Sequence, residues 1–428
     1  MSDPLPGGWK LVKITDCMEA IIDYRGKTPQ KTSVGVPLIT ARIVKGGRIL
    51  DIEEYIAPED YDAWMRRGLP KPGDVVITTE APLGEVAQLD GRKVALAQRL
   101  ITLRGKSDRL DNTFLKFLLQ SEFVRGQIQG RGSGTTVIGI RQSELREVHL
   151  PIPPLNEQRV IAHILGSLDD KIALNRRTNR TLAELAAALF KSWFVDFDPV
   201  VAKMEGRQPF GMDAETAALF PAAFEESEIG LAPAGWRVGS ILELADLLSG
   251  GTPSTSVASY WNGDVPWVSA KDVSNANGLF VLETERTISA EGVERSATKL
   301  LRKLTTVVTA RGTVGSYCLL GGEMAMNQTN YGLRSKDGIS HYFVFFALAQ
   351  MVEQLKQHAY GTIFDTITTK AFQDLKVILP AHATIQRFER RVSPLMELIL
   401  MNLQQSRTLA AIRDALLPKL MAGEIRVG

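Results

Sequence analysis

Two short stretches of this sequence could, by residue type alone, bind a phosphate group. "GKT" at 26–28 and "GKS" at 105–107 resemble the end of a phosphate-binding loop. Such a loop requires a glycine five residues upstream, where this sequence has Ile21 and Leu100. We therefore expect no nucleotide-binding loop at either position.

Other catalytic and metal-binding patterns are equally weak. The five histidines have no paired spacing that suits a metal, and neither cysteine, Cys17 or Cys318, has a candidate ligand nearby. Asp374 and Lys376 could form half of a nuclease motif, although an isolated Asp-x-Lys is common by chance. The sequence therefore predicts a chain with no catalytic residues, no metal site and no cofactor of its own.

Polar side chains in loops rich in Gly and Thr suit a different chemistry, that of a DNA-binding surface. Arg and Lys can address guanine, Asn and Gln adenine, and Thr a phosphate or a thymine methyl group. We expect about half of these residues to serve turns and helix caps instead. The candidates in the first part of the chain are Arg25, Lys27, Thr28, Arg42, Thr79, Glu80, Gln98, Arg131, Thr135, Thr136 and Arg141. Those in the second part are Thr252, Ser254, Lys271, Arg311, Thr313, Asn327, Gln328, Tyr360, Thr362, Thr369 and Lys370.

The elements that must position these residues occur twice. "VPLITARIV" at 36–44 returns as "VPWVSAKDV" at 265–273, and "VVITTEAPLGEV" at 75–86 returns as "TVVTARGTVGSY" at 306–317. The matched segments are offset by roughly 224 to 231 residues along the whole chain, which indicates two copies of one domain. At matched positions the copies differ in chemistry: Glu80 corresponds to Arg311, Ala97 to Asn327 and Arg42 to Lys271.

Within each copy the composition and the hydrophobic pattern change once, which predicts an α+β fold followed by a long helix. Short β-branched runs between turn residues come first, and a stretch with almost no Gly and a helical pattern follows. We expect two repeated α+β domains at 1–153 and 231–380, helical regions at 154–200 and 381–428, and a partly ordered linker at 201–230.

Both helical regions carry a heptad seam, and we expect the two helices to form an antiparallel coiled coil. The seam of the first comprises Ile161, Leu165, Leu168, Ile172, Asn175, Asn179, Leu182, Ala186, Leu189 and Trp193. The seam of the second comprises Phe388, Val392, Leu395, Ile399, Asn402, Ser406, Leu409, Arg413, Leu416 and Leu420. The alternative is that each helix packs separately on its own domain.

An antiparallel pairing of these seams places one polar layer in the middle of the coil. Asn175 would lie opposite Ser406, and Asn179 opposite Asn402. Isolated polar seam residues cost stability but fix the register of the helices. Two features disagree with an ideal coil: Arg413 occupies the seam, and Pro394 is expected to bend or delay the second helix.

Bulk composition fits a globular protein of two to four domains. The chain has 428 residues, 44% of them apolar and 23% charged, and a formal net charge of only +2. A DNA-binding surface would therefore be patterned or assisted by basic partners. The N-terminus lacks the apolar core of a signal peptide, and the longest apolar run, at 342–349, is too short to span a bilayer. We expect a cytoplasmic protein.

Two variable α+β halves, each opened by Pro-x-Gly-Trp and followed by a long helix, resemble the specificity subunit of type I restriction-modification enzymes. The segments that carry the resemblance are "LPIPPLNEQRVIAHILGSLDDKIALNRRTNRTLAELAAALFKSWFVDFDPV" at 150–200 and "QRFERRVSPLMELILMNLQQSRTLAAIRDALLPKLMAGEIRV" at 386–427. The resemblance covers essentially the whole chain.

The resemblance implies a DNA-recognition subunit without catalytic activity. Each α+β half would be a target recognition domain that reads one part of a split, asymmetric DNA site, while the coiled coil fixes the spacer. Two DNA-methyltransferase subunits would supply the S-adenosylmethionine site and methylate adenine at N6. Restriction subunits would supply ATP-dependent translocase and nuclease activity that requires magnesium.

Three other interpretations remain open at this point. The chain could be the specificity subunit of a related DNA modification or defence system. It could be a non-DNA scaffold whose duplicated domains bind proteins, or a nuclease built around Asp374 and Lys376.

Overall fold

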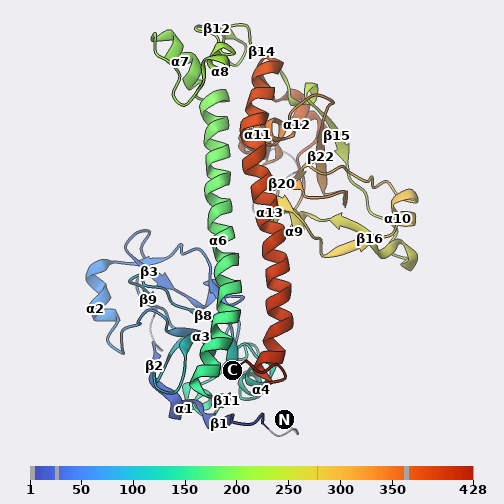
Figure 1. Ribbon diagram of the computed structural model, residues 1–428. Helices are drawn as coiled ribbons and strands as arrows, with labels where there is room; N and C mark the ends of the chain where they lie inside the picture. Colours follow the sequence, from blue (N-terminus) through green and yellow to red (C-terminus); the bar gives the residue numbers. More distant parts are fainter. Residues whose placement is uncertain (1–4, 25–27, 277, 361–365, 428) are drawn as a thin grey trace. The chain divides into compact units, whose positions relative to one another are not determined.

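The computed structural model describes residues 5–24, 28–276, 278–360 and 366–427, without the side chains of 358–360 (Figure 1). The chain divides into two compact units, each with its own core. Unit 1 comprises residues 1–173 and 406–428, and unit 2 comprises residues 174–405. Each of the two long helices begins in one unit and ends in the other.

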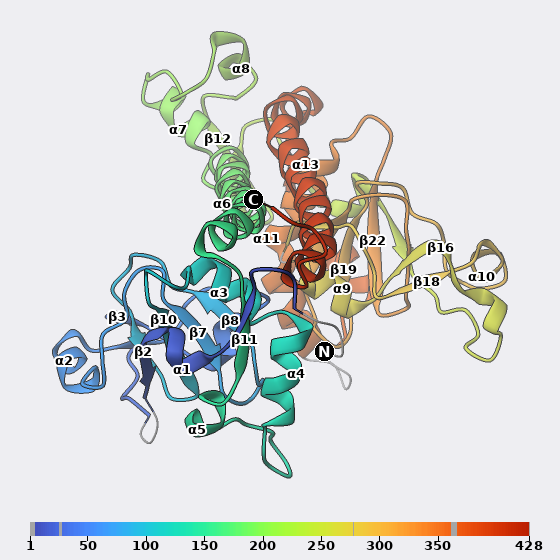
Figure 2. The same cartoon turned by 60° about the horizontal axis from the view of Figure 1, so that its bottom comes forward.

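Unit 1 contains a four-stranded antiparallel sheet in the order β2-β10-β7-β8 (Figure 2). Its strands are β2 (Met18–Asp23), β10 (Leu100–Gly105), β7 (Val75–Thr78) and β8 (Val86–Gln88). A smaller sheet has the order β6-β3-β9, and the remaining strands form two pairs, β1-β11 and β4-β5. These strands are β6 (Tyr55–Ile56), β3 (Val36–Ile39), β9 (Ala95–Leu96), β1 (Lys10–Lys13), β11 (His149–Ile152), β4 (Val44–Lys45) and β5 (Arg48–Ile49).

The short helices of unit 1 are placed by local capping. Asp111 accepts a hydrogen bond from the Phe114 amide at the start of α3, and Ser121 accepts one from the Val124 amide at the start of α4. The helices are α1 (Ile14–Cys17), η1 (Ala41–Ile43), η2 (Pro58–Asp60), α2 (Tyr61–Trp64), α3 (Asn112–Leu118), α4 (Glu122–Gly130) and α5 (Gln142–Leu145).

Unit 2 repeats this plan. Its larger sheet has the order β15-β22-β19-β20-β17, and β18-β16-β21 forms the smaller one. The strands are β14 (Arg237–Ser240), β15 (Ala245–Ser249), β16 (Trp261–Val268), β17 (Phe280–Val281), β18 (Arg286–Ile288), β19 (Thr306–Thr309), β20 (Tyr317–Leu320), β21 (Ala325–Met326), β22 (Asn330–Ser335) and β23 (Lys376–Leu379). The helices are η3 (Ile241–Glu243), η4 (Ala258–Tyr260), α9 (Ala270–Asn275), α10 (Ala290–Glu294), α11 (His341–Tyr360) and α12 (Thr369–Asp374).

The strand pairs confirm the duplication predicted from the sequence. β7 pairs with β10 in unit 1 as β19 pairs with β22 in unit 2, and the parallel pair β3-β9 returns as β16-β21. The chain-closing pair β1-β11 likewise returns as β14-β23. Equivalent strands begin 225 to 231 residues apart, as the matched phrases indicate.

The two predicted long helices, α6 (Leu155–Phe194) and α13 (His382–Met421), each contain 40 residues. Within unit 1, the first turns of α6 share a core with the last turns of α13, where Ile161 and Leu165 join Leu420. Within unit 2 the order is reversed, because Phe190 near the end of α6 contacts Phe388 near the start of α13. The helices are therefore antiparallel, and every predicted seam residue is buried or half-buried.

The predicted polar layer forms in part as expected. The Asn402 side chain donates a hydrogen bond to Asn179 Oδ1 at 2.9 Å, which confirms that pairing. Asn175 donates to Gln405 Oε1 at 2.9 Å and is 3.3 Å from the Asn402 carbonyl. The side chain found opposite Asn175 within unit 2 is thus that of Gln405, next to the predicted Ser406.

The two expected irregularities of the second helix have different outcomes. Pro394 does not delay α13, which begins at His382, twelve residues earlier, and continues past the proline to Met421. Arg413 is accommodated in the seam because Asp169 of α6 lies 2.7 Å from its guanidinium. A seam cation with a partner costs far less than one that is buried alone.

The segment after α6, which includes the linker expected at 201–230, contains regular secondary structure. It contains α7 (Asp198–Met204), α8 (Ala214–Ala218) and a hairpin of β12 (Phe224–Ser227) and β13 (Gly230–Pro233). Within unit 2 it is held to α13 by two ion pairs, Arg391 to Asp213 at 2.9 Å and Arg387 to Glu215 at 2.6 Å.

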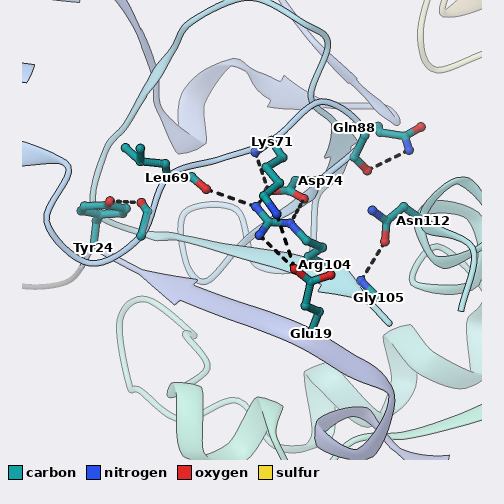
Figure 3. Close-up of polar contacts among 11 residues, drawn as sticks. Glu19, Tyr24, Leu69, Lys71, Asp74, Gln88, Arg104, Gly105 and Asn112 are labelled. Carbon is teal, nitrogen blue, oxygen red and sulfur yellow. Dashed lines mark hydrogen bonds and ion pairs between the residues drawn. The ribbon is translucent and has the colours of Figure 1, made fainter. Parts of the chain in front are cut away.

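The end of the unit 1 sheet at which β7 begins is fixed by a buried ion pair (Figure 3). Arg104 makes two hydrogen bonds, of 2.8 and 2.7 Å, to the Asp74 carboxylate, which is 1% exposed. The Asp74 carboxylate also accepts from the Lys71 amide, while Arg104 donates to the Leu69 carbonyl. A bidentate ion pair of this kind fixes the orientation of both side chains. It therefore holds the start of β7 firmly against β10.

Candidate nucleic-acid interface

The opposite end of β7 lies beside a surface depression of unit 1. The depression has a volume of about 300 Å³ and unites three segments distant in sequence. Its walls are formed by Thr79, Glu80, Gln98, Arg99, Ser133, Val137, Gly139, Ile140 and Arg141. Four of the residues predicted to bind DNA (Thr79, Glu80, Gln98 and Arg141) therefore lie together.

Backbone hydrogen bonds hold the three segments in place. The Thr79 amide donates to the Arg99 carbonyl at 2.9 Å, and the Ile140 amide donates to the Thr79 carbonyl at 2.9 Å. Glycine at position 139 suits this close approach, because a Cβ there would lie only 3.2 Å from both the Thr79 carbonyl oxygen and the Glu80 Cβ. The loop can therefore approach the turn closely enough to form the wall of the depression.

Glu80 and Arg99 form an ion pair at the rim. Arg99 Nε lies 2.7 Å from Glu80 Oε1, and both side chains remain partly exposed. Arg99 has a φ of +73°, which is uncommon for a residue with a Cβ. Nearby, Gln98 donates to the Thr28 hydroxyl at 2.9 Å, so another predicted pair also meets here. Glu80 and Arg99 thus present a hydrogen-bond acceptor and several donors side by side, which suits recognition of a base edge.

The other candidates of unit 1 are spread more widely. Arg42 pairs with Glu53 at 3.1 Å, and Arg131 lies 3.5 Å from Glu144. Thr135 and Thr136 are exposed in the loop between α4 and α5. Arg25 and Lys27 lie outside the described residues.

Unit 2 rebuilds the same turn with a different charge. The Ala310 amide donates to the Thr329 carbonyl at 2.7 Å, and the Ile367 amide donates to the Ala310 carbonyl at 3.1 Å. These bonds match those of Thr79 in unit 1, so exposed Arg311 occupies the position that Glu80 occupies there. The same two backbone hydrogen bonds thus frame an anion in unit 1 and a cation in unit 2.

The remaining candidates of unit 2 divide between surface and structural roles. Thr252 donates to Gln328, Lys271 pairs with Glu285 at 2.7 Å, and all three predicted side chains are exposed. Asn327 instead accepts from the Thr329 amide and hydroxyl, at 3.1 and 2.7 Å, which stabilises its own turn.

The other unit 2 candidates are also placed. Thr313 lies 2.7 Å from the Ser274 hydroxyl, and Ser254 lies 2.8 Å from that of Ser256. Thr369 and Lys370 are exposed in the first turn of α12. Thr362 and the side chain of Tyr360 lie outside the described residues.

The described residues offer little that would support catalysis. No group of three His, Cys, Asp or Glu side chains that could hold a metal is found among them. Lys376, the second half of the possible nuclease motif, lies 3.8 Å from Glu228. Cys17 and Cys318 are free and buried, and burial raises the pKa of the Cys17 thiol to about 11 and that of Cys318 further still. Neither thiol is therefore a nucleophile near neutral pH.

Comparison with known proteins identifies the same architecture elsewhere. Residues 6–184 and 233–402 match the family described as "Type I restriction modification DNA specificity domain", once in each copy of the repeat. The specificity subunit of the type I restriction enzyme HindI from Haemophilus influenzae is 31% identical over 317 residues, which are 64% of this chain and 69% of that protein. The MjaIX specificity subunit from Methanocaldococcus jannaschii is 25% identical over 440 residues, 99% of this chain and 95% of that protein.

A solved structure shares the fold. The type I restriction-modification S subunit from M. genitalium superposes with a TM-score of 0.60 over 98% of both chains, at 17% sequence identity. Within the described part of the chain, no helix combines the length and apolarity needed to cross a bilayer.

The two α+β units, their repetition and the match of the family model to each copy define this chain as a DNA-recognition protein with two copies of one domain. The chain belongs to the type I restriction-modification DNA specificity family. It is a specificity subunit that recognises DNA and is not itself catalytic, since the catalytic activities of such complexes lie in partner subunits.

Proposed function

We propose that this subunit reads a two-part, asymmetric DNA site, one part with the domain at 1–153 and the other with the domain at 231–380. The helical regions at 154–200 and 381–428 would set the unspecified spacer, and residues 201–230 would connect the halves. The matched turns of the two units support this proposal most directly, because one backbone frame presents Glu80 in one unit and Arg311 in the other.

Opposite charges at matched positions predict different half-sites. A glutamate accepts a hydrogen bond from the exocyclic amine of cytosine, whereas an arginine donates to guanine. Around these two residues we propose that the other predicted polar side chains contact bases or phosphates of the same half-site. Asn327 contributes to the turn and not to the DNA contact.

The family resemblance suggests the partners, and the duplication supports two equivalent binding surfaces. We propose that each unit, with its part of the helix pair, binds one DNA-methyltransferase subunit, so that the two equivalent units recruit two of them. These subunits would hold S-adenosylmethionine and modify adenine. Restriction subunits that use ATP and magnesium would join the same assembly. Because its substrate is cellular DNA, we place the complex in the cytoplasm.

Methylation sequencing of cells tests this function. A strain with the subunit and its methyltransferase should show N6-methyladenine at a single bipartite motif, and deletion of the gene should abolish it. Arg311→Ala should relax discrimination at one base pair of one half-site by about 1–3 kcal/mol. Arg207→Ala, which removes an exposed cation of the connecting segment, is the control and should leave the motif unchanged.

Two outcomes would contradict the proposal. If methylation persists unchanged without the gene, the chain does not direct it. If Arg311→Ala weakens methylation equally at all sequences, the side chain contacts phosphate and does not read a base.

A further inference from the structure

An arginine of unit 2 outside the predicted set is held over two tryptophans. The Arg286 guanidinium lies 3.7 Å from the ring centroid of Trp261 and 5.6 Å from that of Trp267. The two indoles meet edge to face, with centroids 5.2 Å apart and planes at 90°. Arg286 opens β18 and lies opposite Trp267 on β16, so the sheet brings the three residues together.

The indoles are themselves fixed by hydrogen bonds. Trp261 Nε1 donates to the Ser254 carbonyl at 3.1 Å, and Trp267 Nε1 donates to the Gly251 carbonyl at 3.0 Å. A guanidinium stacked on a fixed ring keeps its plane defined while the N–H groups along its edge stay available. Arg286 is therefore pre-oriented to donate to a planar or tetrahedral anion.

The charge of Arg286 is not neutralised by the described part of unit 2. Its side chain is exposed, and no carboxylate of the described residues pairs with it. The adjacent carboxylate of Glu285 is engaged by Lys271 at 2.7 Å.

This cation adjoins surface already proposed to contact DNA. Ser254, whose carbonyl accepts from Trp261, is a predicted DNA-binding residue, and Lys271 pairs with the residue next to Arg286. Thr252 lies in the same glycine-rich loop as Ser254. Arg286 thus extends the same surface by one exposed positive charge.

Unit 1 has the opposite charge at the matched position. Leu38 replaces Trp267, and the residue opposite it is Glu54, which pairs with Lys31 at 2.9 Å. The connection to the central strand also differs in charge. Residues 286–305 carry five basic and two acidic side chains, whereas residues 54–74 carry three basic and five acidic ones. The extra positive surface is therefore a property of unit 2.

We propose that Arg286, oriented by Trp261, binds a backbone phosphate of the DNA duplex beside the half-site read by unit 2. This inference rests on the proposed function and assigns Arg286 the role of a positioning residue. It fixes the duplex on the domain and leaves base discrimination to the turn that carries Arg311. Unit 1 has no counterpart of this contact at Glu54.

The salt dependence of DNA binding tests the assignment. The full-length subunit, assembled with its methyltransferase subunits, is titrated with a duplex carrying the methylated motif and with duplexes in which each base pair of the motif is changed singly. Loss of one phosphate contact lowers the slope of log K against log[salt] by about 0.9. Raising KCl from 50 to 200 mM weakens binding of both complexes. The fold-loss of affinity should be about 3.5 times smaller for Arg286→Gln than for the unaltered complex. The weakening should be the same for every duplex.

Two further variants control the experiment. Arg207→Gln removes the same charge from the connecting segment and should leave the slope unchanged. Trp261→Leu retains the arginine but not its support, and should weaken binding about two- to fivefold. The thermal unfolding midpoint of each complex shows whether the variant is folded.

Each other result is decisive. An unchanged slope for Arg286→Gln would show that Arg286 does not contact a phosphate. Relaxed discrimination at one base pair would show that Arg286 contacts a base instead. Either result leaves the proposed function intact, provided that the unaltered complex prefers its motif. If the unaltered complex binds all duplexes equally, both the proposed function and this inference fail.

Discussion

The two units hold their parts of the helix pair with different chemistry. In unit 1, Asp169 of α6 accepts from Lys116 of α3 and pairs with Arg413 of α13 at 2.7 Å. In unit 2 an aromatic cluster joins the domain to the helices, and Phe388 of α13 has ring neighbours in Phe190, Trp193, Phe194, Phe343 and Phe346. At aligned helix positions, Asp169 corresponds to Met396 and Arg413 to Ala186.

This difference shows which features of the repeat the fold requires. The strand pairings and the matched turns are shared, whereas the chemistry between domain and helices is not. Burial lowers the pKa of Arg413, but its hydrogen bonds to Asp169 and Asp414 outweigh that effect and raise the pKa above its ordinary value. Either a satisfied ionic cluster, as in unit 1, or apolar side chains, as in unit 2, can thus occupy the same helix positions.

Among these variants, removal of the Phe388 ring should lower the free energy of unfolding the most. Phe388→Ala deletes a fully buried side chain and leaves a cavity, which should lower the free energy of unfolding by about 4 kcal/mol. Urea denaturation measures the loss, and amide exchange should place it in unit 2. Met401→Ala on the same helix is the control, since its side chain is 57% exposed and should cost less than about 0.5 kcal/mol. Equal losses for the two variants would contradict the role of the aromatic cluster.

Disruption of the ionic cluster of unit 1 should have a smaller effect. Asp169→Ala leaves Lys116 and Arg413 close together without a carboxylate between them, and should lower the free energy of unfolding by about 2 kcal/mol, because the cluster is only partly buried. The exposed neighbour Asp170→Ala is the matched control.

A combined replacement tests whether the two chemistries are interchangeable. Lys116→Met, Asp169→Met and Arg413→Ala together introduce apolar residues, as unit 2 has at its aligned helix positions, and should recover most of the stability lost by Asp169→Ala alone. If the triple variant is less stable than the single one, the ionic cluster contributes more than the packing that replaces it.

The polar layer should have the smallest effect on stability. Asn179→Leu with Asn402→Leu removes a hydrogen-bonded pair from the seam and should raise the free energy of unfolding by about 1 kcal/mol, because apolar seam residues pack better. The same change removes a feature that fixes register, so methylation sequencing should detect a second spacer length. A single unchanged spacer would show that the domains, and not the asparagines, fix the register.

The sequence predicted most of the fold because the fold is repeated. Matched phrases at a constant offset located the equivalent strands, and a heptad seam free of glycine located α6 and α13. The hydrogen bond from Asn175 to Gln405 was not predicted, because seam positions define a layer that a flexible neighbour outside the seam can also reach. The delay expected from Pro394 does not occur, and its side chain lies on the exposed side of α13.

Residue type predicted several members of the candidate site, but it did not predict which residues lie together in space. Residue type alone selected Thr79, Glu80 and Gln98, which do meet in space. It missed Arg99, whose left-handed backbone has no sequence signal, although an arginine next to a predicted glutamine in a turn could have suggested it. It also missed Arg286, because only the pairing of β16 with β18 reveals the tryptophans beneath it.

The division of the chain into units reverses the order in which they can be completed during translation. Unit 2 is a continuous segment, 174–405, whereas unit 1 needs residues 406–428, which leave the ribosome after all of unit 2. Until then Ile161 and Leu165 lack Leu420, and Trp9 lacks the Gly423 turn that packs against it. The half that is synthesised first is therefore completed last, and its apolar surface is the one that stays exposed longest on the nascent chain.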